Sequence, residues 1–288
     1  MVKTYGDLYL NARREIAKFE PEQASFVARE LMAAATGKTV EQLLRDRDAA
    51  APPQMELHLN KLILDYVQDK PLPYILGSWS FFGLDLKVTP DVLIPRDDTL
   101  PVTQLAMEKL PKGGKMRVLD LCTGSGCIGI AIGARCPHAR VTLADISDAA
   151  LAIAKENVTT HRLQFRTNIV KLDAMQPCPD FLGKYDVIVS NPPYITVEEM
   201  KGLDRSVREY EPHLALCGGE DGLDFYRAIC ENFSDALTDG GWLCFEFGKG
   251  QEDAVGAILS EYHYSDLQFS KDTSEITRAV AARKTERN

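Results

Sequence analysis

The spacing of apolar residues changes about a quarter of the way along the chain. Up to residue 75, apolar side chains recur three and four positions apart, which predicts amphipathic helices. The clearest such repeats run over residues 26–34 and 57–67. Pro52-Pro53 interrupts the pattern, and Pro71 and Pro73 are expected to end it. We therefore expect a helical N-terminal domain over residues 1–75, which either only stabilises the protein or recruits a substrate.

A short linker with a strand pattern follows over residues 76–100. The sequence from Tyr74 to Gly77 predicts a strand and a turn, and Leu84, Leu86 and Val88 then alternate with polar residues. Strict alternation is typical of a half-buried strand, so we expect a β-hairpin here.

Strands and helices alternate through the remaining segment, residues 101–288. The expected strands are 117–121, 140–145, 185–190 and 241–247, with a weaker strand pattern at 168–172. The expected helices are 128–135 and 147–158, the second with Ser147 as its N-cap. Such alternation predicts a mostly parallel sheet with right-handed crossovers and helices on both faces.

Composition is that of an ordinary globular protein and excludes several classes. Hydrophobic residues make up 45% and charged residues 26% of the 288. No apolar run approaches the roughly 20 residues that cross a bilayer, and the N-terminus lacks the apolar block of a signal peptide. We therefore expect a cytoplasmic protein that does not bind membranes. The seven cysteines include no C-x-x-C pair, and the five histidines do not cluster near them, so we expect neither disulfides nor a metal site.

The net charge of −9 disfavours a nucleic-acid partner. A protein that binds a duplex usually presents a basic surface to the phosphates. Here the basic residues form only short runs, although a local patch is compatible with a negative total. We expect no stable nucleic-acid binding.

A glycine-rich turn joins the first strand of the alternating segment to its helix. Glycine lets the backbone approach a ligand closely, but NAD and FAD enzymes use such turns too, so the turn alone is weak evidence. The order C-T-G-S-G is closer to that of methyltransferases than to the dinucleotide fingerprint. The candidate cofactor-binding residues of this turn are Cys122, Thr123, Gly124, Ser125 and Gly126.

Two aspartates follow at the ends of later strands. Asp145 lies 19 residues after Gly126, where a carboxylate can accept hydrogen bonds from both ribose hydroxyls of an adenosine. It could equally be an acid at the start of the next helix. Asp173, with Ala174 beside it, would lie near the adenine edge, or Asp173 could be an ordinary turn aspartate.

The tetrapeptide Asn191-Pro192-Pro193-Tyr194 directly follows a buried strand. It should therefore lie at the carboxyl edge of the sheet, where open α/β sheets bind ligands. An amide nitrogen is a poor nucleophile, and a site can help by accepting hydrogen bonds from both of its protons. The Asn191 side-chain oxygen and the Pro192 carbonyl supply two acceptors, the prolines fix the backbone, and Tyr194 offers a face for stacking. A loop that simply stops a strand would show the same four residues.

Nine segments together resemble the HemK/PrmC family, the glutamine-N5 methyltransferases of class 1 peptide-chain release factors. They are PLPYILG (71–77), FFGLDLKV (81–88), VLIPRDDT (92–99), VLDLCTGSGCIGIA (118–131), ADIS (144–147), NPPYI (191–195), EPHLAL (211–216), GGEDGLDFYRAI (218–229) and EFGKGQ (246–251). The set is much more specific than N-P-P-Y, which adenine-N6 DNA methyltransferases share.

The resemblance implies a class I, Rossmann-like α/β methyltransferase fold with a mostly parallel seven-stranded sheet. It also implies that S-adenosylmethionine contacts Cys122 to Gly126, Asp145, Asp173, Ala174 and Asn191. The target glutamine, in the Gly-Gly-Gln loop of a release factor, would lie between Asn191 to Tyr194 and a wall that includes Phe82. The N-terminal helical domain would help to recruit that protein.

Some positions depart from the family pattern, and three further functions stay open. Cys122 replaces the usual first glycine of the turn, and Asp97 to Leu100 stand where Pro-Glu-Thr-Glu is common. The family often has an aromatic residue at the position of Ala174 and a histidine at the position of Phe247.

A cysteine at the position of Cys122 is frequent in the sister enzyme that methylates a glutamine of ribosomal protein L3. The chain could also be an adenine-N6 nucleic-acid methyltransferase or a cofactor-binding scaffold without activity.

Overall fold

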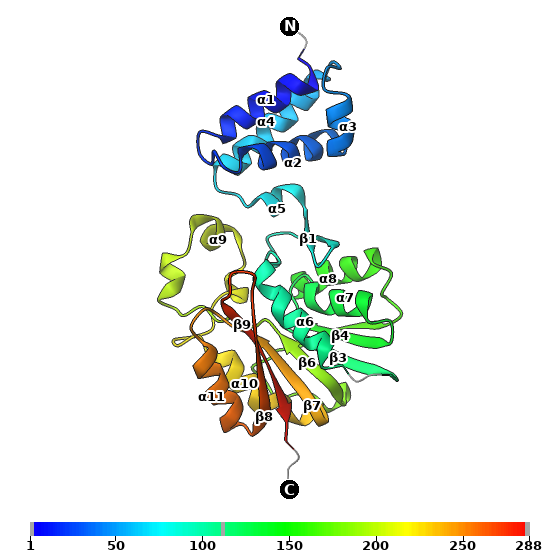
Figure 1. The fold of residues 1–288 in the computed structure, drawn as a ribbon, viewed down its shortest axis with the longest axis vertical. Coiled ribbons are helices and arrows are strands. Elements are labelled where there is room, and N and C mark those ends of the chain that lie inside the picture. The colour runs from blue at the N-terminus through cyan, green and yellow to red at the C-terminus, as the bar shows by residue number, and fades with distance from the viewer. Residues whose placement is uncertain (1–2, 111–112, 286–288) are drawn as a thin grey trace. The chain divides into compact units, whose positions relative to one another are not determined.

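The computed structural model describes residues 3–110 and 113–285 (Figure 1). Its chain divides into two compact units, the first formed by residues 1–78 with 205–210 and the second by residues 79–204 with 211–288. None of the helices in the described ranges is long and apolar enough to cross a membrane.

The first unit consists of helices. They are α1 (Tyr5–Ile16), α2 (Ala24–Thr36), α3 (Val40–Arg45), α4 (Pro53–Val67), α5 (Leu72–Leu76) and α9 (Arg205–Tyr210). Their apolar faces meet in a small core that includes Leu8, Ile16, Leu31 and Leu59, all almost fully buried. The helical expectation for this part of the chain is therefore correct.

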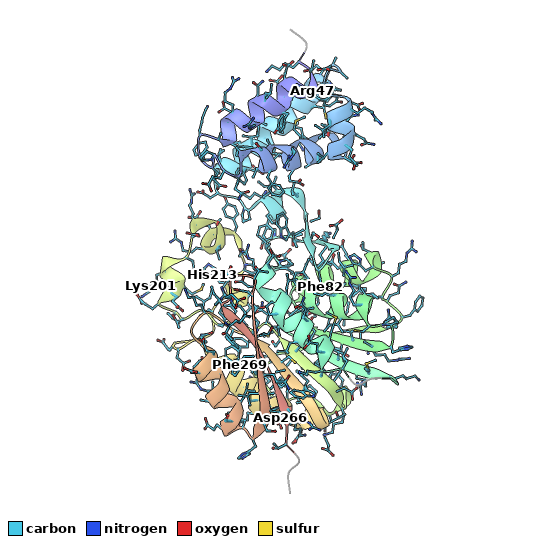
Figure 2. The ribbon with its side chains drawn as sticks, viewed as in Figure 1. Arg47, Phe82, Lys201, His213, Asp266 and Phe269 are labelled. Carbon is cyan, nitrogen blue, oxygen red and sulfur yellow. The ribbon has the colours of Figure 1, made fainter. Side chains whose placement is uncertain are left out.

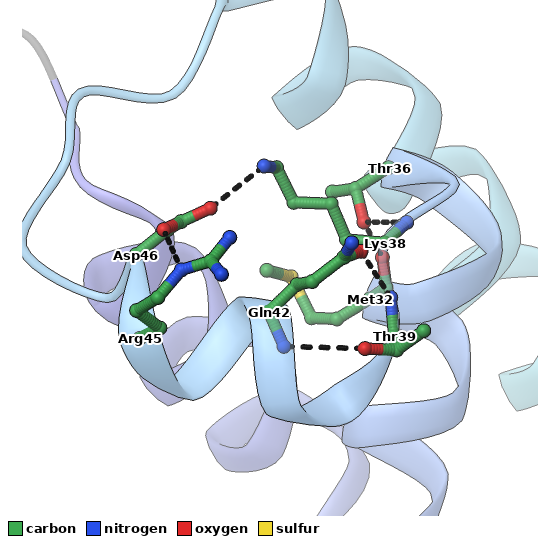
Figure 3. Close-up of polar contacts among 7 residues, drawn as sticks. All are labelled: Met32, Thr36, Lys38, Thr39, Gln42, Arg45 and Asp46. Carbon is green, nitrogen blue, oxygen red and sulfur yellow. Dashed lines mark hydrogen bonds and ion pairs between the residues drawn. The ribbon is translucent and has the colours of Figure 1, made fainter.

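The short helix α3 is fixed to the end of α2 by polar contacts (Figure 3). Thr39 caps α3 by accepting a hydrogen bond from the Gln42 amide, while the Gln42 side chain accepts one from the Thr39 amide. Lys38 then pairs with Asp46 at 2.8 Å across the helix. A capping box of this kind satisfies two amides that would otherwise lack partners, which lets a six-residue helix persist.

The strand and turn expected at Tyr74 to Gly77 are wrong, because the residues form helix α5. Pro71 and Pro73 do not end the helical segment but begin another turn, since a proline's missing N–H costs nothing in the first turn of a helix. Gly77 then ends α5 in the left-handed conformation, with φ of 75°.

Helix α9 joins the first unit although it lies between two segments of the second in sequence. Arg205 pairs with Asp69 at 3.1 Å, and the Tyr210 hydroxyl donates to the Gln68 carbonyl at 3.1 Å. The sequence pattern gives no indication of this connection.

The second unit is a seven-stranded sheet with helices on both faces. The strand order is β5-β4-β3-β6-β7-β9-β8, with β9 antiparallel to β7 and to β8 and the other pairs parallel. The strands are β3 (Met116–Leu121), β4 (Ala139–Asp145), β5 (Thr167–Lys171), β6 (Tyr185–Ser190), β7 (Leu237–Glu246), β8 (Tyr264–Lys271) and β9 (Thr277–Lys284). This is the predicted class I methyltransferase fold.

Two apolar clusters fill the space between sheet and helices, and Figure 1 shows the helices on either side. Helices α6 (Leu100–Glu108), α7 (Cys127–Arg135) and α8 (Asp148–Thr160) pack on one face, while α10 (Asp224–Phe233) and α11 (Glu252–Glu261) pack on the other. Central strands such as β6 bury side chains on both faces, as parallel strands do. Ser147 caps α8 as predicted, accepting from the Ala150 amide at 3.2 Å.

The expected hairpin consists of β1 (Ser78–Phe81) and β2 (Leu84–Lys87). Leu86 and Val88 are buried and Leu84 is partly buried, in agreement with the alternation in the sequence. Five 3₁₀ segments complete the described elements: η1 (Asp97–Thr99), η2 (Asp180–Leu182), η3 (Glu199–Gly202), η4 (His213–Ala215) and η5 (Ser234–Ala236).

Candidate active site

The glycine-rich turn leads from β3 into α7 and is tied to its neighbour β4. The Thr123 amide donates to the Ala144 carbonyl at 3.1 Å, and the Gly126 amide donates to the Thr123 carbonyl at 2.8 Å. Gly126 has φ of 83°, and a Cβ there would lie 2.8 Å from the Ile130 side chain. Glycine is therefore required at this position both for its backbone angle and for space.

Cys122 stands at the first position of the turn, where the resemblance noted in the sequence predicts glycine. Its φ of 57° lies in the left-handed region, which costs a residue with a Cβ about 1–2 kcal/mol. The turn still forms around it, since the Thr123 and Gly126 hydrogen bonds are in place.

Asp120 supports the turn from below and was not identified from the sequence. Its Oδ2 accepts from the Thr123 hydroxyl at 2.6 Å and from the Gly129 amide at 2.9 Å. The carboxyl is fully buried, its Oδ1 has no partner in the structure, and burial raises its pKa to about 7. The only signal in the sequence was an acid within an otherwise apolar strand.

This buried carboxyl makes stability depend on pH in a direction that can be tested. Between about pH 4, the ordinary pKa of an aspartate, and pH 7, the unfolded chain binds fewer protons at Asp120 than the folded chain. Stability therefore falls as the pH rises through this window, by up to about 1.4 kcal/mol per pH unit. Asp120→Asn should flatten that slope in denaturant unfolding. The slope from Glu246, whose pKa burial raises to about 8, should remain. Identical slopes in both proteins would contradict this account.

Asp145, at the end of β4, connects the turn to the start of α8. Its Oδ2 accepts from the Gly124 amide at 2.9 Å and its Oδ1 from the Ser147 amide at 3.0 Å. Both roles considered from the sequence are thus compatible, because a carboxylate has about four acceptor positions and these bonds use two. The remaining positions suit the two hydroxyls of a ribose.

A cavity of about 260 Å³ lies at the carboxyl ends of β3, β4, β5 and β6. The predicted residues that line it are Cys122, Thr123, Gly124, Ser125, Asp145, Asp173, Ala174, Asn191 and Pro193. Ile146, Leu172 and Met175 add apolar walls beside Asp145, which suits an adenine next to a ribose. Asp173 also accepts from the Met175 amide at 2.9 Å, so it is a turn aspartate as well as a cavity residue.

Four predicted site residues do not line this cavity: Gly126, Pro192, Tyr194 and Phe82. Gly126 and Pro192 are buried behind its wall. The Tyr194 ring is partly buried against the core and close to Gly248, and burial raises its pKa. Its stacking role stays a prediction.

Phe82, labelled in Figure 2, lies at the turn of the β1–β2 hairpin and is not among the residues that line the cavity. Its φ is 52°, and the Arg135 guanidinium lies over its ring at 5.5 Å while donating to the Phe82 carbonyl at 3.0 Å. Phe82 does not line this cavity, and its expected place in the wall of the glutamine pocket stays a prediction.

Two further segments contribute to the lining of the cavity, residues 91–95 and residues from 212 to 215. Glu211 joins them, since its carboxylate accepts from the Ile94 amide at 3.2 Å and pairs with Arg96. Burial raises the pKa of Glu211, whereas the Arg96 charge lowers it. The sequence motifs VLIPRDDT and EPHLAL marked these segments, but nothing in them indicated that they meet.

The N-P-P-Y loop is held by two glycine-containing segments. A Cβ on Gly218 would lie 2.6 Å from the Pro193 carbonyl oxygen, and a Cβ on Gly222 would lie 2.4 Å from the Tyr194 carbonyl oxygen. The Gln251 side chain donates a hydrogen bond to the same Tyr194 carbonyl oxygen at 3.1 Å. The backbone of the loop is therefore fixed on two sides.

Gly218→Ala should displace this loop. Overpacking of this kind costs about 1–3 kcal/mol of stability, and a shift of the loop by about 1 Å should lower kcat/KM about 100-fold. The matched control is Gly202→Ala, where a Cβ meets nothing within 4 Å. Thermal unfolding and initial rates measure both effects, and equal rates for the two variants would contradict the prediction.

Asn191 lines the cavity at the end of β6, and its side chain is held from behind. Its Nδ2 donates to the Thr99 hydroxyl at 3.4 Å. Burial raises the pKa of the neighbouring Glu246 carboxyl to about 8, and hydrogen bonding from Thr99 and Asn191 opposes that rise. A carboxamide with its nitrogen bound in this way keeps its oxygen available as an acceptor.

Comparison with known proteins identifies the family. Residues 7–77 match the PrmC N-terminal domain, and residues 97–209 match the methyltransferase small domain. A release factor glutamine methyltransferase from Geobacter sulfurreducens is 37% identical over 271 residues, which cover 94% of this chain and 93% of that protein. The chain belongs to the release factor glutamine methyltransferase family. Another member, from Clostridium botulinum, is 38% identical over 77% of this chain and 79% of its own length.

The solved structures agree with the fold of this glutamine methyltransferase family member. The catalytic domain of human Mettl16 in complex with an RNA hairpin has a TM-score of 0.56 at 19% identity, with 81% of this chain and 82% of that chain covered. A Pyrococcus furiosus methyltransferase has a TM-score of 0.52 at 17% identity, over 79% of this chain and 98% of that chain. Family membership implies S-adenosylmethionine as the cofactor, and the residues of the cavity fit that molecule: a carboxylate for the ribose, apolar side chains for the adenine and a glycine-rich turn.

Proposed function

We propose that this protein transfers a methyl group from S-adenosylmethionine to the side-chain amide nitrogen of the glutamine in the Gly-Gly-Gln loop of class 1 release factors. The observation that carries the proposal is that Asn191 opens onto the same cavity as Asp145 and the glycine-rich turn. The side chain that would hold the methyl-accepting amide of the glutamine thus lines the same cavity as the residues expected to bind S-adenosylmethionine.

The residues of the loop orient the acceptor. The Asn191 oxygen and the Pro192 carbonyl accept the two N–H groups of the glutamine amide, which turns the nitrogen lone pair toward the methyl donor. When bound, S-adenosylmethionine supplies an electrophilic methyl group on sulfur. The N–CH₃ bond forms as the S–CH₃ bond breaks, and the nitrogen then loses a proton to water. Orientation of this kind contributes up to about 7–11 kcal/mol.

The first unit provides a surface for recruiting the release factor. Apolar side chains that are largely exposed there include Phe19, Leu44, Leu57 and Leu64. A cavity of about 340 Å³ lies among α1, α2 and α3. Exposed apolar groups on a small helical unit are typical of a docking surface. Since release factors act in the cytoplasm, we place the protein there as well.

The test is transfer of labelled methyl from S-adenosylmethionine to purified proteins. The acceptors are a class 1 release factor, the same factor with its loop glutamine changed to alanine, and ribosomal protein L3. Label in the first alone supports the proposal. Label in L3 and not in the release factor would overturn it in favour of the sister activity suggested by Cys122.

A further inference from the structure

Two side chains behind Asn191 belong to sequence motifs with no assigned role. Thr99 ends VLIPRDDT and Glu246 begins EFGKGQ. Both side chains are buried, Thr99 at 2% and Glu246 at 2% exposure. Thr99 lines the cavity beside Asn191, whereas Glu246 does not and lies behind the other two.

The three side chains form one buried polar group. The Asn191 Nδ2 donates to the Thr99 Oγ1 at 3.4 Å, and both Thr99 and Asn191 act on the Glu246 carboxyl by opposing the rise that burial causes in its pKa. Because the Asn191 Nδ2 is the atom that donates to the Thr99 hydroxyl, the nitrogen end of the carboxamide faces Thr99. The opposite end of the carboxamide, its oxygen, is then directed away from Thr99.

Each member comes from a different, well-supported element. Asn191 directly follows β6, and Glu246 is the last residue of β7, which pairs with β6. The Glu246 carbonyl accepts from the Tyr226 hydroxyl at 2.9 Å. Thr99 ends η1, where its amide donates to the Arg96 carbonyl at 3.1 Å and its carbonyl accepts from Thr103 at 2.9 Å. The backbones that carry Thr99 and Glu246 are therefore held in place.

The buried carboxyl is costly, which argues for a role beyond packing. Burial raises the pKa of Glu246 to about 8, and the bonds from Thr99 and Asn191 lower it. Its Oε2 has no partner in the structure. An apolar residue would avoid this cost, so the group is expected to serve a function.

We infer that Thr99 and Glu246 are positioning residues that fix the Asn191 carboxamide with its oxygen toward the acceptor amide. The inference rests on the proposed function for the identity of the acceptor. Without this pair, the carboxamide can rotate by 180° and present its N–H₂ to the N–H₂ of the substrate. Whenever the carboxamide is flipped, the substrate amide lacks one of the two hydrogen-bond acceptors for its N–H groups. Its nitrogen is then held less firmly toward the methyl donor.

Thr99→Val removes the hydroxyl while nearly keeping the shape. We expect kcat to fall about 10–100-fold, since loose orientation of a reacting group costs rates of that order. S-adenosylmethionine affinity, measured by calorimetry, should change less than about threefold, a shift of under 1 kcal/mol. Thr99→Ser restores the hydroxyl and should recover most of the rate. The matched control is Thr160→Val, the same change on the exposed surface of α8, which should stay within about twofold.

A double-mutant cycle separates positioning from a merely structural role. In the Asn191→Ala background there is no carboxamide to orient, so adding Thr99→Val should cost less than about twofold. An equal loss in both backgrounds would overturn the inference, as would a single Thr99→Val variant with normal kcat.

If Thr99→Val fails to fold, the rates of two Glu246 variants are compared instead. Glu246→Gln keeps one hydrogen-bond acceptor oxygen in the side chain, and Glu246→Met keeps none. Glu246→Gln should retain more activity, and equal rates would overturn the inference.

Failure of the proposed function looks different. A wild-type enzyme that leaves the release factor unmethylated overturns that function alone, and the same cycle is then measured with ribosomal protein L3, whose glutamine amide needs the same orientation.

Discussion

Asn191→Ala should lower kcat/KM for methylation of a release factor by about 10²–10³-fold, the cost of removing one preorganised hydrogen-bonding group from an active site. The variant removes the acceptor oxygen from the cavity and leaves the Glu246 carboxylate with one donor fewer. Initial rates at saturating S-adenosylmethionine measure the effect. Asn168→Ala, an exposed asparagine on β5, is the matched control and should keep the normal rate.

Asn191→Asp sharpens this result. It keeps an oxygen on the cavity side but loses the Nδ2 that donates to Thr99, and it places a second carboxyl next to Glu246. Two like charges, or a proton on the wrong oxygen, would disturb the orientation of the substrate amide. We therefore expect a loss of kcat/KM close to that of the alanine variant. Normal activity in either variant would contradict the assigned role of Asn191.

Asp145→Ala should weaken S-adenosylmethionine binding about 100-fold. Hydrogen bonds to a charged group contribute about 1.5–3 kcal/mol each, and a tenfold change in affinity corresponds to about 1.4 kcal/mol. The variant also frees the Gly124 amide, which Asp145 holds at 2.9 Å, so the turn loses its anchor. Titration calorimetry gives the dissociation constant directly.

The control for Asp145→Ala is Asp148→Ala. Asp148 lies three residues later at the start of α8 and is exposed, and its pairing with Lys171 is a surface ion pair of little energetic value. Its variant should bind with nearly normal affinity. A dissociation constant within about threefold of wild type for Asp145→Ala would show that this carboxylate does not hold the ribose.

Strands β3 to β7 and helices α7 and α8 of the second unit were predictable because their signals are local, whereas β8, β9, α6, α10 and α11 were not located from the sequence. An apolar run such as 185–190 can bury itself only as a central strand, and the N-P-P-Y loop must then lie at its carboxyl end. The cavity follows from that placement, since Asp145 and the glycine-rich turn end neighbouring strands. These features depend on short-range pattern and on the rules of parallel sheets.

What could not be predicted depends on pairs that are distant in sequence. Glu211 meets Ile94, Glu246 meets Thr99, and α9 meets the residues around Asp69. A single sequence does not indicate which buried acid finds which partner. The sequence motifs identified these positions but did not indicate which of them are in contact.

Helix α5 was mispredicted for a local reason, and Phe82 has a local conformation that the sequence did not predict. Phe82 has a positive φ at a hairpin turn, an angle that phenylalanine rarely adopts, and this turns its ring toward Arg135. A proline breaks the interior of a helix but is compatible with its first turn. We expected Pro71 and Pro73 to end a helix, whereas they lie at the start of α5.

The measurement that tests the central claim most directly is tandem mass spectrometry of a release factor after incubation with the enzyme and S-adenosylmethionine. The account predicts one added methyl group, located on the side chain of the glutamine in the Gly-Gly-Gln loop. A methyl group on any other residue, or an unmodified loop peptide beside methylated ribosomal protein L3, would contradict it.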